Sequence, residues 1–518
     1  MNIVRTLVEK IKAGYPAIYL LTAEDARAVA NIEDAAAQTG RKVFIWTYKK
    51  GLFTKTQKGH SKIESTEEPD QVLEQALKLP QNSIIILRHY HHYLDSALIQ
   101  AMLLDLVPNF KATRRQLIVQ TPVLKLPPEM EKDFSLVEVP LPTRDELLGI
   151  VDNFATNVGK PDDTMRRALA ENARGFTISE AENAIALAAI RPNLDKKSND
   201  KLIWDAEVVK DEKCETVKKS GFLTYYPESG IGMNQLGGMG LLKQWMEKRA
   251  KVFKNPDAAA AFKLPLPKGI LLLGPPGTGK SLGARVTANT FGLPLIRVDM
   301  GAIFGGIVGQ SEANARNVIK FLEATSPNIA WLDEIEKGFA GSSGGGQLDS
   351  GVGARVLATF LTWMQEKTSS VFVYATSNNV RLLPPEMLRK GRFDEMFFVS
   401  LPNIQEREEI FKIQVSKFGR SHLIGPPKID LKQLAGMTSG FSGAEIEAVV
   451  RDALYDAFEV DKDLNMFDLQ EAIGNVVPLE KMMEAEIKDL QKWAEGRARP
   501  ANFPEEVQGK AGTRAVQM

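Results

Sequence analysis

The chain has 518 residues, 44% of them hydrophobic and 25% charged, which is enough to fill the cores of about three domains. Basic and acidic residues number 65 each, and this zero formal net charge argues against a general nucleic-acid or acidic-lipid binder. Cys214 is the single cysteine, so an intrachain disulfide is excluded. Neither a signal-peptide pattern nor an apolar run long enough for a membrane span is present. We therefore expect a cytoplasmic protein with no membrane span and no specific nucleic-acid partner.

Residues 1–195 alternate short apolar runs with helical patterns, which predicts an α/β domain. The run "RHYHHY" (Arg88 to Tyr93) suggests a metal site, because it holds three histidines within four positions. Such closely spaced histidines cannot all face one ion, and no cysteine or acid flanks them closely, so a polar strand end is favoured. Residues 196–229 are rich in charge and are expected to form a linker that packs in part through Trp204.

A phosphate-binding loop is predicted next. The apolar run "GILLL" (Gly269 to Leu273) is typical of a strand buried on both faces, and "GPPGTGKS" follows at once. Its glycines permit a backbone that turns several N–H groups toward a phosphate, at the positive end of the following helix. Lys280 is expected to contact the β- and γ-phosphates of ATP, and the Ser281 hydroxyl to hold Mg²⁺. The residues expected to contact the cofactor here are Gly274, Pro275, Pro276, Gly277, Thr278, Gly279, Lys280, Ser281 and Leu282.

The hydrolytic residues are expected at the ends of two further strands. "NIAWLDEIEK" ends in acids, of which Asp333 is expected to bind Mg²⁺ and Glu334 to polarise the attacking water. "VFVYATSNNV" is a third buried strand, and ligands of an open parallel sheet sit outside such strand ends. Asn378 is therefore predicted to position the water or the γ-phosphate, with Ser377 or Thr376 as alternatives because the spacing is loose.

Two arginines follow in "EMLRKGRFDE". Arg389 and Arg392 could be a solvated basic helix end, but their place after the third strand suits fingers that reach a neighbouring subunit's γ-phosphate. An arginine finger contributes about 10³–10⁵ in rate. If the arginines act in trans, activity depends on assembly.

The motifs, in this order, resemble those of the AAA clade of the AAA+ superfamily. "LGGMGLLKQW" resembles the adenine-side segment and contains Gly237, and "TSGFSGAEIEAVVRDAL" resembles the helical lid, whose Gly443 and Ala444 would approach the nucleotide. Four longer stretches, among them "LPPEMLRKGRFDEMFFVSLP" and "QKWAEGRARPA", are similar to the hypothetical AAA family of chloroplast and cyanobacterial genomes, over almost the whole chain. This resemblance implies a chloroplast stroma or a bacterial cytoplasm as the compartment.

The pore-loop text departs from the pattern of AAA unfoldases. In "FGGIVGQSE" the aromatic position holds Ile307, the usual basic position holds Gly306, and Phe304 lies three residues early, which puts processive threading in doubt. "GSSGGGQLDSGVGAR" (Gly341 to Arg355) corresponds either to a second pore-facing loop or to a disordered insertion.

The N-terminal region echoes the ATPase module. "KLPPEM" parallels "LLPPEM", "LAENARGFTISEAENAIALA" parallels "LAGMTSGFSGAEIEAVVRDA", and "IIILRHY" stands where "IAWLDEI" would, with Arg88 and His89 in place of the acids. "AIYLLTAEDARAV" stands where the phosphate-loop strand would, without Gly-Lys-Ser. We infer a degenerate copy that does not bind ATP tightly.

The predicted fold is α/β: a P-loop AAA+ module, with a parallel five-stranded sheet and a helical lid, preceded by the degenerate AAA-like module. The expected boundaries are 1–195 for the degenerate module, 196–229 for the linker, 230–402 for the ATPase subdomain, 403–475 for the lid and 476–518 for a C-terminal helix and flexible tail. The expected function is Mg-ATP hydrolysis in a homo-oligomeric ring, a hexamer by resemblance, coupled to remodelling of a protein client. The alternative is a slow ATP-gated switch or assembly scaffold.

Overall fold

The computed structural model describes residues 3–56, 59–194, 203–219, 221–226, 230–304, 310–338, 350–389 and 391–504. The chain divides into two compact units, Met1–Val209 and Lys210–Met518. The division falls inside the range expected as a linker. The pore-loop residues Gly306 and Ile307, whose sequence departs from that of AAA unfoldases, lie outside the described residues. So do residues 341–349 of the glycine-rich stretch and the tail after residue 504.

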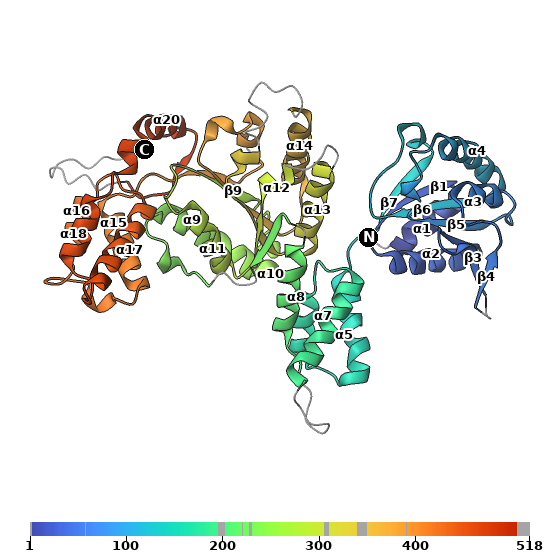
Figure 1. Ribbon diagram of the computed structural model, residues 1–518, viewed down its shortest axis with the longest axis horizontal. Coiled ribbons are helices and arrows are strands. Elements are labelled where there is room, and N and C mark those ends of the chain that lie inside the picture. Colours follow the sequence, from blue (N-terminus) through green and yellow to red (C-terminus); the bar gives the residue numbers. More distant parts are fainter. Residues whose placement is uncertain are drawn as a thin grey trace. The chain divides into compact units, whose positions relative to one another are not determined.

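The first unit contains a seven-stranded sheet in the order β4-β3-β2-β5-β6-β1-β7. Its strands are β1 (Ala17–Leu21), β2 (Lys42–Thr47), β3 (Gly51–Thr56), β4 (Gly59–Ile63), β5 (Ser83–Arg88), β6 (Gln116–Thr121) and β7 (Phe134–Glu138). Strands β2, β5, β6, β1 and β7 run parallel, and β3 and β4 extend one edge as antiparallel strands. Figure 1 labels this sheet in the blue part of the chain.

Helices cover both faces of this sheet, as the apolar strands predict. One face packs on α1 (Ile3–Lys12) and α2 (Asp25–Thr39), and the other on α3 (Pro69–Ala76) and α4 (Ala97–Thr113). The helices α5 (Arg144–Val158), α6 (Asp163–Asn172) and α7 (Ile178–Ile190) then form a separate core, which includes the buried Trp204. The partial packing predicted for Trp204 is therefore present.

The second unit contains another seven-stranded sheet, in the order β14-β13-β9-β12-β11-β10-β8. Its strands are β8 (Leu223–Tyr226), β9 (Gly269–Leu273), β10 (Leu295–Val298), β11 (Asn328–Leu332), β12 (Val371–Ser377), β13 (Glu395–Phe398) and β14 (Arg499–Pro500). On one face lie α9 (Gly240–Lys254) and α11 (Lys280–Phe291), and on the other α13 (Gln310–Ala324) and α14 (Ser350–Glu366). Two shorter helices are α10 (Pro256–Ala261) and α12 (Met300–Phe304).

The prediction of a five-stranded sheet was wrong at both edges. Five parallel strands form the centre, but β8 adds an antiparallel strand beside β10, and β14 adds a parallel strand beside β13. Strand β8 follows α8 (Ala206–Lys218), so the range expected as a linker supplies a helix and a sheet strand. Strands β8 and β14 lie outside the sequence range expected for the ATPase subdomain, so the hydrophobic pattern of that range could not predict them. Their pairing with the sheet is set by tertiary contact.

The lid is the helical group drawn in orange and red at one end of the second unit (Figure 1). It contains α15 (Ile404–Lys417), α16 (Leu431–Met437), α17 (Gly443–Glu459) and α18 (Met466–Gly474), around one apolar core. Capping boxes begin three of these helices: Asn403 with Glu406 at α15, Ser442 with Glu445 at α17, and Asn465 with Asp468 at α18. The same device begins α5 and α7 in the first unit, through Thr143 with Glu146 and Thr177 with Glu180.

The C-terminal segment returns to the ATPase sheet. The single predicted helix is divided into α19 (Leu479–Met482) and α20 (Glu484–Ala494), and β14 then pairs with β13. The Ala501 carbonyl accepts from the Leu241 and Leu242 amides at the start of α9, at 3.0 and 3.2 Å. Order therefore continues past Ala501, where the sequence predicted a tail, and this segment joins the sheet to the first helix of the ATPase subdomain.

Candidate active site

The predicted phosphate loop links the end of β9 to the start of α11. Neighbouring strands β12 and β11 end at the same edge of the sheet, because all three run parallel. The structure therefore brings together Lys280, Ser281, Asp333, Glu334 and Asn378, which are separated by up to about a hundred residues in sequence.

The loop glycines occupy positions that exclude a side chain. Gly277 and Gly279 have φ of 74° and 88°, in the left-handed region that favours glycine. A Cβ on Gly274 would lie 2.2 Å from the Val399 carbonyl oxygen. Of the other loop residues, Pro275 and Thr278 are buried, Pro276 and Leu282 are partly buried, and Thr278 Oγ1 donates to the Pro275 carbonyl at 2.9 Å. This loop backbone fits the predicted role of binding a phosphate.

Lys280 is 5% exposed and folds back over this loop. Its Nζ donates to the carbonyls of Gly274 and Pro275 at 2.8 and 2.6 Å. Burial lowers the pKa of Lys280 to about 8, although the carboxylates of Glu336, Asp333 and Glu334 raise it. A buried ammonium whose hydrogen-bond acceptors are neutral loop oxygens fits a phosphate ligand, whose negative charge would restore a high pKa.

Three oxygen-bearing side chains meet at the predicted metal position. Asp333 Oδ1 accepts from Ser281 Oγ at 3.0 Å and from Thr376 Oγ1 at 2.8 Å. Arg297 Nη2 lies 3.4 Å from Asp333 Oδ2. A carboxylate beside hydroxyl groups is the hard donor set that Mg²⁺ prefers, so these residues fit that ion.

Glu334 lies one residue further on and is oriented by Asn378. The Asn378 Nδ2 donates to Glu334 Oε1 at 3.0 Å, and the Asn378 amide donates to Glu336 Oε1 at 2.8 Å. Glu334 has φ of 47°, and its amide donates to Thr376 Oγ1 at 3.0 Å, so the backbone is turned sharply after β11. Lys337 forms an ion pair with Glu334. Of the three residues considered for the γ-phosphate position, Asn378 touches Glu334, Thr376 touches Asp333, and Ser377 is buried.

The predicted adenine-side residues surround the other end of the loop. The Ala444 amide donates to the Gly277 carbonyl at 3.0 Å, and Gly443 adjoins the same oxygen. A Cβ on Gly237 would lie 2.4 Å from Ile410 of the lid, and Met239 packs against Gly279. Gly237, Gly443 and Ala444 therefore lie where the lid meets the phosphate loop.

The two arginines lie apart from these groups. Arg389 follows a short 3₁₀ turn, Pro385–Leu388, and is exposed. The Arg392 guanidinium donates to the Glu386 carbonyl of the same turn. No hydrogen bond links either arginine to Lys280, Asp333 or Glu334 among the described residues.

Sequence reasoning missed two supporting residues. Tyr374, fully buried on β12, donates its hydroxyl to the Lys280 carbonyl at 2.9 Å. The buried Glu336 fixes the backbone of Asn378. Tyr374 lies in an apolar strand and is typical of core there, but the glycine at position 283, which leaves room for its hydroxyl, offers a signal.

A P-loop beside a lid, on a parallel sheet with acids at the neighbouring strand end, defines an ATPase of the AAA class. Family models agree: residues 270–401 match the ATPase family associated with various cellular activities, residues 428–465 the AAA+ lid domain, and residues 3–139 the SpoVK-like AAA ATPase N-terminal domain. The chain is therefore an ATPase that binds ATP.

The similarity to known proteins extends over the whole chain. The chain is 33% identical to the uncharacterized AAA domain-containing protein ycf46 of Pyropia yezoensis, over 511 residues that make up 97% of this chain and all of that relative. It is 34% identical over 506 residues, 95% of both chains, to the ycf46 protein of Guillardia theta. A cell division cycle protein 48 homolog of Archaeoglobus fulgidus is 29% identical over 351 residues, 64% of this chain and 46% of that protein. The chain belongs to the ycf46 family of AAA domain-containing proteins.

Among the described residues, none of the helices is both long and apolar enough to cross a membrane.

Proposed function

We propose that this chain hydrolyses Mg-ATP in a homo-oligomeric ring, a hexamer, and uses the energy to remodel a protein client. The observation that supports ATP hydrolysis is the hydrogen bond of 3.0 Å from the side-chain amide of Asn378 to the Glu334 carboxylate. This bond lies beside the hydrogen-bonded pair Ser281–Asp333. This arrangement resembles a base with its orienting group next to a metal position. Mg²⁺ would neutralise developing phosphate charge when bound.

Each residue then has a separate task. The loop amides and Lys280 would bind the β- and γ-phosphates, and Ser281 and Asp333 would hold the metal. Glu334 would accept a hydrogen bond from the attacking water and turn its lone pair toward the γ-phosphate. Asn378 would fix the Glu334 carboxylate, which lies at the end of a rigid strand turn.

Assembly is proposed from the arginines. Arg389 is exposed and is not bonded to the site of its own chain among the described residues. A neighbouring chain's Arg389 or Arg392 would supply positive charge to the γ-phosphate. The single cysteine and the ycf46 relatives support a reducing compartment, the bacterial cytoplasm or the chloroplast stroma.

The ATP-gated switch stays as the second candidate, because the pore-loop sequence carries Ile307 in place of an aromatic residue. The two candidates differ in their response to a client. A remodelling ATPase turns over faster as the client is titrated, whereas a switch does not require this.

The first experiment measures ATPase rate per chain against protein concentration, with mass by light scattering in the same buffer. Specific activity that rises together with a ring-sized mass supports arginines acting in trans. Flat, near-zero turnover by a monomer that binds ATP would support the switch. Glu334→Gln should bind ATP and assemble without turnover, whereas Glu366→Gln, at the exposed end of α14, should behave as wild type. Normal turnover by Glu334→Gln would refute the assignment.

A further inference from the structure

The first unit repeats the strand order of the ATPase sheet. Reading from the edge, β7-β1-β6-β5-β2 corresponds to β13-β9-β12-β11-β10. The two sheets can also be aligned residue by residue. Ala17 pairs with Leu117 in the first unit, and Gly269 pairs with Val373 in the second. With these two pairs aligned, the pair Ile84–Gln116 falls on the pair Ile329–Phe372. The counterparts of Asp333, Glu334 and Thr376 are therefore Arg88, His89 and Gln120.

The backbone at these counterparts is also alike. His89 has φ of 54° and Glu334 has φ of 47°, although neither is glycine. Each residue lies just after a central strand and directly precedes a short 3₁₀ helix, η1 (Tyr90–His92) in one unit and η5 (Ile335–Gly338) in the other. The two strand ends are thus the same turn carrying different chemistry.

The charges at this turn are reversed. In the ATPase unit Lys280 begins α11 and faces acids, whereas in the first unit Asp25 begins α2 and faces basic groups. Asp25 Oδ2 lies 2.6 Å from Arg88 Nη2 and 2.7 Å from His89 Nε2. Asp25 Oδ1 accepts from Gln120 Nε2 at 2.9 Å. The phosphate region of the copy therefore holds the chain's own carboxylate.

The ionised state of Asp25 is favoured by these contacts. Burial opposes ionisation, but the hydrogen bonds from Arg88 and His89 and their positive charges lower the pKa of Asp25 overall.

The loop before Asp25 is also shorter than a phosphate loop, because residues 22–24 link β1 to α2, whereas residues 274–279 link β9 to α11.

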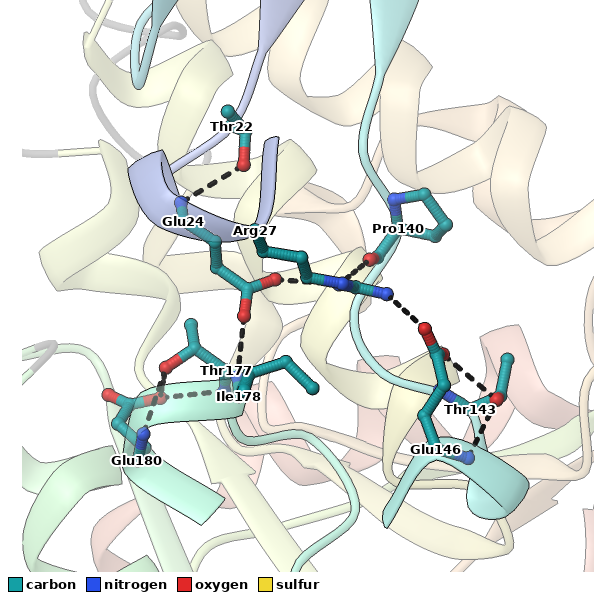
Figure 2. Close-up of polar contacts among 9 residues, drawn as sticks. All are labelled: Thr22, Glu24, Arg27, Pro140, Thr143, Glu146, Thr177, Ile178 and Glu180. Carbon is teal, nitrogen blue, oxygen red and sulfur yellow. Dashed lines mark hydrogen bonds and ion pairs between the residues drawn. The ribbon is translucent and has the colours of Figure 1, made fainter. Parts of the chain in front are cut away.

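A second set of contacts joins this short loop to the helices α5 and α7 (Figure 2). Glu24 Oε1 accepts from the Ile178 amide at 2.5 Å, at the first turn of α7. Arg27 donates to Glu24 at 2.7 Å, to the Pro140 carbonyl at 2.7 Å and to Glu146 at 2.9 Å. The side chains of Arg27 and Glu24 are only 12% and 9% exposed, so solvent screens their ion pair weakly.

These contacts stand where the ATPase unit has the junction between its phosphate loop and its lid. There the Gly277 carbonyl of the phosphate loop accepts from Ala444 at the first turn of α17, so loop and lid meet around the nucleotide position. In the first unit the carboxylate of Glu24 takes the place of that loop carbonyl, and it accepts from the Ile178 amide at the first turn of α7. Arg27 adds bonds to the connecting segment and to the capping residue of α5.

We propose that the first unit has a self-occupied site: the Asp25 carboxylate fills the phosphate position, and Arg27 with Glu24 latches the helical group α5–α7 to the sheet. The first unit is then a rigid, nucleotide-insensitive part of the chain, and each chain binds one ATP. This inference does not depend on ring assembly or on client remodelling.

Hydrogen exchange of the full-length chain tests the latch. Arg27→Ala and Glu24→Ala should speed exchange of the Ile178 amide and of the first turn of α5 about ten- to a hundredfold, the range for a lost hydrogen bond to a charged group. Arg166→Ala is the matched control, because Arg166 pairs with Asp152 within the helical group and does not contact the sheet. It should leave exchange at Ile178 unchanged. Unchanged exchange at Ile178 in Arg27→Ala and Glu24→Ala would overturn the latch.

Equilibrium dialysis with ATP tests the filled site. Wild type should bind one ATP per chain, and Lys280→Ala should bind none. Two ATP per chain, or ATP retained by Lys280→Ala, would overturn the self-occupied site. Absence of binding by wild type would instead refute the ATPase proposal for the second unit, while the exchange experiment still decides the latch.

Discussion

Asn502→Ala should destabilise the second unit in a pH-dependent way. Asn502 lies just after β14, and its Nδ2 donates to both oxygens of Glu406 at 3.0 and 2.9 Å. Glu406 is 7% exposed and caps the start of α15, the first helix of the lid. The substitution removes the partner of a buried carboxylate at the junction of sheet and lid.

The size of the effect follows from these bonds. Hydrogen bonds to charged groups contribute about 1.5–3 kcal/mol each, and one amide serves both, so we expect a loss of about 2–4 kcal/mol. At about 2 °C per kcal/mol for a domain of this size, Tm should fall by about 4–8 °C at pH 8.

The pH dependence has a definite sign. Burial raises the pKa of Glu406, and hydrogen bonds from Asn502, Asn403 and Met239 oppose that rise. Without Asn502 the pKa of Glu406 should rise further. A carboxyl with a raised folded pKa contributes stability that is present below its unfolded pKa and lost as pH rises through the folded pKa. The deficit of Asn502→Ala should therefore shrink between pH 8 and pH 5.

Thermal unfolding of the full-length chain at pH 8 and pH 5 measures this. Glu406→Gln combined with Asn502→Ala should remove most of the pH dependence, because no carboxyl remains to titrate. Asn475→Ala, an exposed asparagine after α18, is the control and should shift Tm little. Equal Tm deficits at the two pH values, or none at either, would show that Asn502 does not compensate the Glu406 charge.

Three further predictions concern the ATP site. Burial lowers the pKa of Lys280 to about 8, so the KM for ATP should rise above pH 8, and ATP binding there should take up a proton. Calorimetry in buffers of different ionisation enthalpy would detect this proton uptake. A KM that stays flat from about pH 7 to 9 would contradict the prediction. Thr376→Val removes the hydroxyl that bonds Asp333 and should lower kcat about tenfold or more at saturating Mg²⁺, with an unchanged rate as the opposing result. Gly283→Ala places a Cβ 2.2 Å from the Tyr374 hydroxyl and should weaken ATP binding, and adding Tyr374→Phe should restore it in part; failure of that rescue would exclude the clash as the cause.

The sequence by itself determined the ATPase fold class and most of the candidate site. The phosphate loop is local, because its glycines, lysine and serine act within one strand-to-helix turn. The acids Asp333 and Glu334 and the amide of Asn378 follow apolar runs that could only be central strands, and parallel strands end at one edge. Local chemistry and strand direction were therefore sufficient to bring these residues together.

Only the tertiary structure decided the pairings across the sheet. Thr376 bonds Asp333 because of the register of β12 against β11, which is set by packing, and a change of one residue would reverse the two faces. The edge strands β8 and β14 join the sheet from outside the predicted module. The contacts of Asp25 with Arg88 and Gln120 join residues brought together by crossover helices, and no spacing rule predicts which charges meet there. Side-chain chemistry is written in the chain, whereas the partner of each side chain is fixed by strand order and register.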